Sequence, residues 1–336
     1  MGRFFGPTPN IISAEGFFRG SAGSSGPFTW TQVITGFESG GTWFDCGYAG
    51  GHYWIAKGTA TTASIITSPD LVTFTDHLIL NATSYRTRGL AFGASTYVAA
   101  LDENPAFGIL AFTSSDLVTW TQHNANFPAV GANQFVNIPI FGNGVFLLVS
   151  QGGPDYATSP DGATWTLQST YVPTFWGQPL FDGTRFVAPV MGASNTPKIA
   201  VSSDGINWTE SSATLSASFS AGSLPFFMGA NGTPLYIVGE NNDDAGEAVN
   251  AALTSATPFS FNDSGNGTNW IQFGSASWAR CNDVDGNLFS SSNGTTWVQD
   301  TVAGSPTSFN NMGFGGGHFI AIGFNAGGHF LAMRAD

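Results

Sequence analysis

Carboxylate side chains are the first residues in this chain that could do chemistry, because two of them placed together can act as a general acid and a general base. Two acidic groups stand out, Asp102-Glu103 and Asp243-Asp244, the latter with Glu240 and Glu247 nearby. We expect both groups on loops between strands, where such a pair can hydrolyse a glycosidic bond. Acidic loop residues are more often simply solvated. We therefore predict no catalytic residues.

A second kind of chemistry is metal binding through side-chain oxygens. Asp283, Asp285 and Asn287 alternate along the chain, with Gly286 allowing a sharp bend, and hard cations prefer such oxygen ligands. Asp-Gly-Asn is also an ordinary hairpin turn. These three residues are kept as candidate metal ligands, but we predict no metal and no other cofactor.

Aromatic residues beside cationic and amide groups form the third set, and they would suit a sugar through stacking and hydrogen bonding. The candidate ligand-binding residues are Tyr85, Arg86, Arg88, His123, Tyr171, Trp176 and Trp270. For Trp176 and Trp270 we favour the alternative that the rings are buried between structural units.

The elements that must position these residues are indicated by a short repeated phrase, Ser-x-Asp followed by an aromatic residue. The carboxylate position is occupied by Asp70, Asp116, Asp161, Asp204 and Asn293, and the aromatic position by Phe74, Trp120, Trp165, Trp208 and Trp297. The first four are spaced by 46, 45 and 43 residues. Ser and Asp oxygens can accept hydrogen bonds from the N–H groups of their own turn. Degenerate copies are expected at residues 24–30, ending in Trp30, and at residues 254–259.

A second phrase runs at the same period, a glycine-rich turn followed by an aromatic and apolar residues, as in Gly50-Gly51-His52-Tyr53 and Gly142-Asn143-Gly144-Val145. Such turns between apolar runs predict hairpins. Together the two phrases predict seven units of four short strands each. The chain opens on one phrase and closes on the other, so we expect a strand near residues 28–33 to complete the last unit.

With these phrases the sequence resembles the Asp-box, or BNR-like, β-propellers, which include sialidases, photosystem assembly factors and many secreted and phage proteins. The resemblance covers the chain from about residue 22 and implies a seven-bladed all-β propeller. One residue fewer separates Asp161 from Trp165 than in the familiar box. The three arginines, the Tyr–Glu pair and the Arg-Ile-Pro phrase of sialidases have no counterpart here, so no sialidase catalytic residue is carried over.

Composition limits the partners. The net charge is −13, with 9 Lys and Arg against 22 Asp and Glu, which argues against binding to nucleic acid or anionic lipid. We expect Cys46 and Cys281 to be buried thiols and not a disulfide. No run of 18 apolar residues predicts insertion into a membrane. The start of the chain lacks the features of a secretory signal.

Residues 1–21 do not fit the repeat and are predicted to be a docking arm, with the propeller at residues 22–336. Phe4, Phe5, Phe17 and Phe18 are the candidate docking residues; the alternative is that the arm folds back onto its own propeller. From this we predict a non-enzymatic structural or adhesion component of a bacteriophage virion, docked onto other virion proteins through residues 1–21. The alternatives are a carbohydrate-binding, receptor-binding propeller, and a glycoside hydrolase or lyase acting on surface polysaccharide. The expected location is the virion, or alternatively the extracellular space.

Overall fold

A computed structural model describes most of the chain from residue 27 to residue 335. The described ranges are 27–35, 42–59, 61–82, 85–103, 109–124, 135–136, 138–151, 155–168, 174–192, 196–215, 226–230, 235–240, 245–261, 270–274, 276–281, 286–325 and 330–335. The predicted arm at residues 1–21 lies outside them, as does the loop pair Asp243-Asp244. None of the described segments is a helix that could cross a membrane.

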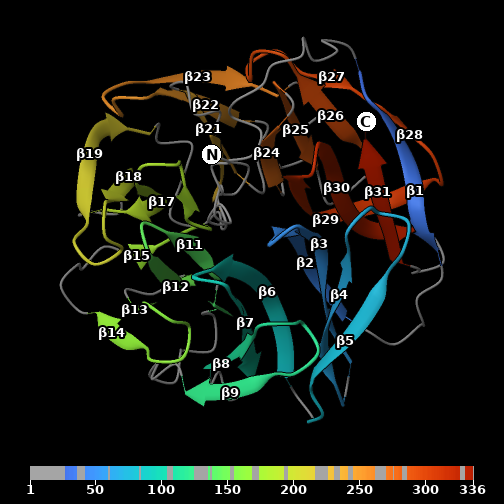
Figure 1. Ribbon diagram of the computed structural model, residues 1–336. Helices are drawn as coiled ribbons and strands as arrows, with labels where there is room; N and C mark the ends of the chain where they lie inside the picture. Colours follow the sequence, from blue (N-terminus) through green and yellow to red (C-terminus); the bar gives the residue numbers. More distant parts are fainter. Residues whose placement is uncertain are drawn as a thin grey trace, which may run out of the picture.

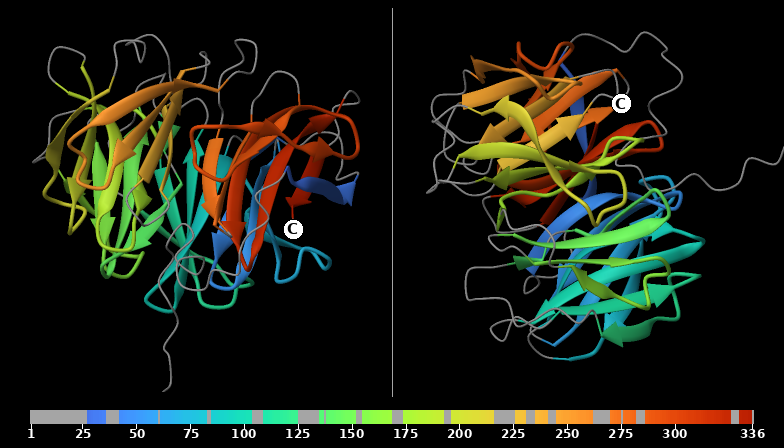
Figure 2. Two further views of the ribbon diagram at one scale, coloured as in Figure 1. Left: turned by 90° about the horizontal axis from the view of Figure 1, so that it is seen from above. Right: turned by 90° about the vertical axis from the view of Figure 1, so that its left-hand side faces the viewer.

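The described strands form seven sheets, four with four strands and three with five, placed around one axis (Figure 1). Seen from the side, the sheets stand next to one another with their strands running between two faces of the ring (Figure 2). In six of the sheets the strand pairs are all antiparallel and follow the chain outward from the axis, except that β10 and β11 both pair with β12, and β15 and β16 both pair with β17. The predicted all-β propeller with four-stranded antiparallel blades is confirmed.

We number these six sheets as blades in chain order. Blade 1 contains β2 (Thr42–Ala49), β3 (His52–Gly58), β4 (Ala63–Ser68) and β5 (Thr75–Leu80). Blade 2 contains β6 (Tyr85–Gly93), β7 (Thr96–Glu103), β8 (Ile109–Ser114) and β9 (Thr121–Asn124). Blade 3 contains β10 (Phe135–Val136), β11 (Ile140–Gly142), β12 (Val145–Gln151), β13 (Tyr156–Ser159) and β14 (Thr166–Gln168).

The next three blades repeat this pattern. Blade 4 contains β15 (Thr174–Phe175), β16 (Leu180–Phe181), β17 (Phe186–Met191), β18 (Pro197–Ser202) and β19 (Thr209–Thr214). Blade 5 contains β20 (Phe226–Ala230), β21 (Leu235–Glu240), β22 (Ala245–Asn250) and β23 (Ala256–Ser260). Blade 6 contains β24 (Trp270–Gly274), β25 (Ser277–Cys281), β26 (Leu288–Ser291) and β27 (Val298–Gln299).

The remaining sheet, which we call the terminal sheet, combines strands from both ends of the described chain. Its order is β28-β1-β31-β30-β29, with β28 at Thr301–Val302, β1 at Thr29–Thr35, β31 at Phe330–Ala335, β30 at His318–Asn325 and β29 at Pro306–Gly315. Strand β1 pairs antiparallel with β31, so that Trp30 lies opposite Ala335. On its other side β1 pairs parallel with β28.

Asp300, between β27 and β28, fastens β1 to blade 6. Its Oδ1 accepts hydrogen bonds from the Phe28 N–H (2.8 Å) and the Ser290 hydroxyl (2.6 Å), and its Oδ2 accepts from the Trp30 indole N–H (2.8 Å). Trp30 is fully buried in a core cluster with Phe309 and Phe319. Burial raises the pKa of the Asp300 carboxyl, although these three donors oppose the shift. Trp30 therefore serves as an anchor between the two ends of the described chain.

The Ser-x-Asp turns join the last two strands of their blades. In blade 3, the Ser159 hydroxyl accepts from the Gly162 N–H (2.8 Å) and donates to Asp161 Oδ1 (3.0 Å). The same Oδ1 accepts from the N–H groups of Ala163 (2.9 Å) and Thr164 (2.8 Å). The backbone hydrogen bond from Thr164 is the largest cause of the lowered pKa of Asp161. The same geometry recurs at Asp70, Asp116, Asp204 and Asn293.

Two of these turns place a leucine where the others place a glycine. Gly162 has φ +77°, in the left-handed region that favours glycine, whereas Leu71 and Leu117 adopt φ values of +58° and +64°. Both leucine side chains are buried in core clusters. Burial of the leucine offsets a backbone strain of about 1 kcal/mol.

The turn of blade 5 differs from the prediction. Residues 256–260 form strand β23, so the degenerate phrase at 254–259 is mostly strand and not turn. Asn250 supplies the acceptor instead, since its Oδ1 accepts hydrogen bonds from the backbone N–H groups of Thr254 (2.8 Å) and Ser255 (3.3 Å). The carboxamide that organises this turn lies before the phrase, at the end of β22.

Adjacent sheets interlock where an aromatic ring covers a glycine at the end of an inner strand. A Cβ atom added to Gly142 would lie 2.2 Å from the Phe181 ring of the next blade. Equivalent contacts join Gly93 with Phe141, Gly274 with Phe314, and Gly315 with Tyr48. At these four places the aromatic residue just before a hairpin turn packs against the preceding blade, and the contact leaves no room for a side chain at the glycine.

Candidate functional site

The inner strands surround an apolar cavity near the axis, with a volume of about 50 Å³. It is lined by Cys46, Gly47, Tyr48, Trp54, Leu90, Ile138, Pro139, Ile140, Trp270, Gln272, Met312, Gly313 and Phe314. These residues come from blades 1, 2, 3 and 6 and from the terminal sheet, and several belong to the innermost strands β2, β6, β24 and β29 (Figure 1). A cavity of this size accommodates a few water molecules.

Next to this cavity, inner strands carry irregularities at which polar side chains are placed. The pairing of β2 with β3 shifts register between Trp43 and Cys46, where Asp45 lies. The pairing of β6 with β7 shifts between Thr87 and Gly89, where Arg88 lies. Strand β29 has a similar shift just before Asn311. Bulges redirect side chains and are frequent beside functional sites.

Asp45 and Asn311 connect blade 1 with the terminal sheet. The Asn311 amide donates to Asp45 Oδ1 at 2.6 Å, while its own oxygen lies 3.6 Å from Cys46 Sγ. Asn311 is fully buried, whereas Asp45 keeps a narrow contact with solvent. The protein surrounding Asp45 raises its pKa to about 7 by desolvation, which Arg88 and Asn311 partly oppose and the charge of Asp102 reinforces.

Arg88 and Asp102 form a buried ion pair within blade 2. Arg88 Nε donates to Asp102 Oδ2 at 2.7 Å, and the two side chains are 13% and 3% exposed. Among the described residues, Asp102 Oδ1 has no hydrogen-bond partner. We call Asp45, Arg88, Asp102 and Asn311 the axial polar cluster. At neutral pH it holds one arginine against two carboxyl groups.

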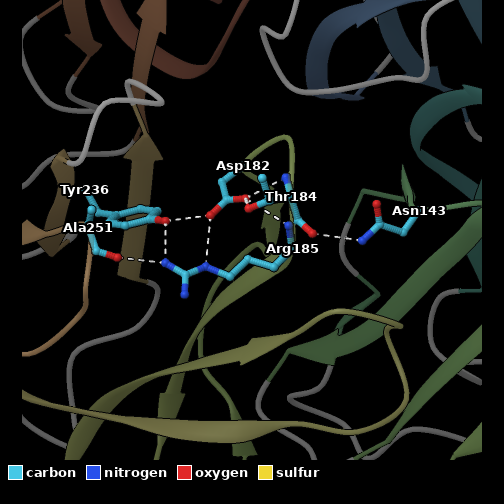
Figure 3. Close-up of polar contacts among 6 residues, drawn as sticks. All are labelled: Asn143, Asp182, Thr184, Arg185, Tyr236 and Ala251. Atoms are coloured by element: carbon cyan, nitrogen blue, oxygen red, sulfur yellow. Dashed lines mark hydrogen bonds and ion pairs between the residues drawn. The ribbon is translucent and has the colours of Figure 1, made fainter.

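A second polar network lies at the hairpin between β16 and β17 (Figure 3). Asp182 Oδ1 accepts from the Thr184 N–H, the Thr184 hydroxyl and the Arg185 N–H, and Oδ2 accepts from Arg185 Nε (3.1 Å) and the Tyr236 hydroxyl (2.6 Å). Arg185 Nη2 also donates to the Ala251 carbonyl oxygen at 2.8 Å. Desolvation and the bond to Asp182 raise the pKa of Tyr236 to about 12. The carboxylate is saturated by donors, so this network joins blades 4 and 5 and is not an open site.

The structure separates the predicted ligand-binding residues. Tyr85, Arg86 and Arg88 lie on inner strand β6, and Trp270 begins inner strand β24 and lines the axial cavity. His123 lies on outer strand β9, where its Nε2 is 2.8 Å from the Thr113 hydroxyl. Trp176 packs against a core cluster of blades 4 and 5. Tyr171 lies outside the described residues, and sugar binding by this set stays a prediction.

The acidic candidates are also placed differently from the prediction. Asp102 lies in strand β7 and Glu247 in strand β22, both buried, and neither is on a loop. The sequence motifs that mark the turns near Asp102 and Glu247 do not show where the neighbouring strands begin and end. Asp283 and Asp285 lie outside the described residues, and Asn287 accepts a hydrogen bond from the Gln299 amide at 2.7 Å. The described residues contain no cluster of three or more His, Cys, Asp or Glu side chains placed to hold a metal ion.

Sequence reasoning named Arg88 and Asp102 separately but missed Asp45 and Asn311. A signal for Asp45 exists, because it is the one charged residue in the run Thr42–Ala49, in which aromatic and small residues predominate. Cys46 and Cys281 are buried thiols and do not form a disulfide with each other, as predicted.

A ring of four-stranded antiparallel sheets around a narrow axial cavity defines the chain as a β-propeller. No protein-family model and no curated protein matches the sequence. Among solved structures, the chain is similar to YCF48 bound to D1 peptide, with 16% identity, a TM-score of 0.63, and coverage of 94% of this chain and 97% of that one. It is also similar to virginiamycin B lyase from Staphylococcus aureus, with 11% identity, a TM-score of 0.66 and coverage of 92% and 99%.

A third similar structure is the GH74 xyloglucanase from Xanthomonas campestris, with 15% identity and a TM-score of 0.59 over 88% of this chain and 52% of that one. These identities establish the shared fold alone, because propellers with the same architecture include peptide binders, a lyase and a hydrolase.

Proposed function

We propose that this chain is a non-enzymatic docking propeller that holds a partner protein on its surface. The observation that carries the proposal is the size of the axial cavity, about 50 Å³ with mostly apolar walls. A polymer or a drug-sized substrate does not fit into such a space. A macromolecular partner would therefore be contacted on the faces and the outer edge of the ring.

Exposed apolar side chains on the outer part of the ring support a protein partner. Val72 and Val118, at the tips of the Ser-x-Asp turns of blades 1 and 2, are 74% and 70% exposed. The equivalent positions in blades 3, 4 and 6 are Ala163, the half-buried Ile206, and Thr295. A turn does not require valine at its tip, and exposed apolar groups on neighbouring blades provide area for a protein contact.

The similar structure of YCF48 bound to D1 peptide supports the idea that a propeller of this shape can hold a polypeptide. None of the three similar structures named above is a phage protein. We therefore propose docking to a protein partner in general. Docking to other virion proteins through residues 1–21 would be one form of it. The packing of Trp176 and Trp270 into the interior favours a protein over a glycan as the partner.

The test is a capture experiment with the full chain immobilised and an extract of its source organism. The variant Val72→Ser/Val118→Ser should lose the captured protein, whereas Ala163→Ser, a change of similar polarity at the equivalent turn of blade 3, should retain it. Release of reducing ends or unsaturated products from surface polysaccharide by the purified chain would instead show an enzyme and refute the proposal.

A further inference from the structure

We propose that the axial polar cluster is a binding site for a single protonated amine or guanidinium group, of the kind carried by a lysine or arginine side chain. That the group belongs to a protein partner rests on the proposed docking function. The binding chemistry itself rests on the geometry of Asp45, Arg88, Asp102 and Asn311.

The placement of the cluster is the first argument. Asp45 and Arg88 both lie at register shifts of inner strands, in neighbouring blades, where the regular alternation of the strand is interrupted. Asp45 keeps contact with solvent, unlike Asn311 behind it. Cys46, the neighbour of Asp45, and Met312, the neighbour of Asn311, line the axial cavity, so the cluster lies beside the space that a small group would enter.

The second argument is a shortage of hydrogen-bond donors. Asn311 donates to one oxygen of Asp45, and Arg88 donates to one oxygen of Asp102. The other oxygen of Asp102, in a side chain that is 3% exposed, has no donor among the described residues. A buried carboxylate oxygen without a donor is costly, and an ammonium or guanidinium group supplies both donors and positive charge.

The charge balance points the same way. Arg88 provides one positive charge for the two carboxyl groups, so ionised Asp45 leaves the cluster with one net negative charge. The charged and titratable groups facing Asp45 are Arg88 from β6, Asp102 from β7 and the neighbouring thiol of Cys46, while β29 presents the neutral Asn311. A monovalent cation would neutralise this arrangement.

The walls beside the cluster suit an alkyl stem. Cys46 and Gly47 follow Asp45 along β2, Met312 and Gly313 follow Asn311 along β29, and all four line the axial cavity. Leu90 and the Trp54 ring complete the apolar surface. Lysine and arginine combine an apolar stem with a charged head, which matches an apolar wall ending at a carboxylate.

The affinity should depend on pH in a defined direction. Protonated Asp45 is neutral and attracts a cation weakly, and ionised Asp45 attracts it strongly. With a pKa near 7, binding should be about tenfold weaker at pH 6 than at pH 8.

The experiment uses the full chain labelled with ¹³C at aspartate carboxyl groups and n-butylammonium as the probe, with n-butylguanidinium as a second cation. We expect the probe to shift the Asp45 resonance, assigned through its backbone, and to lower the pKa of Asp45. Asp45→Asn should weaken binding more than tenfold, and the control Asp76→Asn, at a surface ion pair with Lys57, should bind as the wild type does. Butan-1-ol, which has the same stem without the charge, should not bind.

Equal binding of butan-1-ol, unchanged binding by Asp45→Asn, or a response to Ca²⁺ or K⁺ alone would overturn the proposal. If Asp45→Asn does not fold, the pKa of Asp45 in the wild type with and without probe decides the matter. The docking function is tested separately, because partner capture depends on Val72 and Val118 and not on butylammonium. If butylammonium binds but no partner is captured, the docking function has failed. If a partner is captured but butylammonium does not bind, the cation site has failed.

Discussion

Replacing Asp300 by alanine should release strand β1 from blade 6. The variant would leave three groups without their acceptor in a buried place: the Phe28 N–H, the Trp30 indole N–H and the Ser290 hydroxyl. A buried donor without a partner costs about 1–3 kcal/mol. Because the serine can rotate and water can approach the loosened strand, we take the total as about 3 kcal/mol.

The loss should be local, so hydrogen exchange is the best assay. A cost of about 3 kcal/mol corresponds to roughly 100-fold faster exchange of the β1 amides, with little change in blades 2 to 4. The melting temperature should fall by about 4 °C, given an unfolding entropy of about 0.7 kcal/mol per degree for a chain of this length. Asp300→Asn should lose less, because one oxygen still accepts.

The pH dependence gives a further check on the same residue. The folded-state pKa of Asp300 is raised above the unfolded value, so its contribution to stability is complete below pH 3.8 and decreases as pH rises through the folded pKa. The free energy of unfolding of the wild type relative to Asp300→Asn should fall over that interval and then level off. Unchanged exchange of β1 in Asp300→Ala, or equal acceleration in every blade, would refute the reasoning.

Three other predictions can be checked on the purified chain. Gly142→Ala should lower the free energy of unfolding by about 1–3 kcal/mol in denaturant titration, because its Cβ would overlap the Phe181 ring; no measurable effect would contradict the interlock. Asp161→Ala should cost about 1 kcal/mol at pH 7 and less below the depressed pKa of Asp161, where the protonated carboxyl still accepts but has lost its charge, whereas Asp161→Asn should be close to neutral, as the natural Asn293 turn indicates; equal losses for both would be inconsistent with this. A high-resolution crystal structure should show a water molecule bound to the Trp54 indole N–H, which is buried beside the axial cavity without an acceptor among the described residues; a dry cavity would count against this.

The hairpins and turns were predictable because their signals are local. A glycine pair or a Ser-x-Asp phrase determines hydrogen bonds within five residues, and the turns at Asp161 and Gly142 appear where those phrases stand. The axial polar cluster was not predictable in this way. Its members come from β2, β6, β7 and β29, and they meet through register shifts that no pattern of period two reveals.

The position of β1 beside β31 also bears on how the chain can be rebuilt. Trp30 and Ala335 face one another across paired strands, so a short linker between the first and last described segments would connect neighbours. New ends could then be opened in a hairpin of another blade while every sheet keeps its strands. In a circularly permuted protein of this design, β1 and β31 would be joined covalently, so β1 would stay tethered at both ends even when the Asp300 contact is lost.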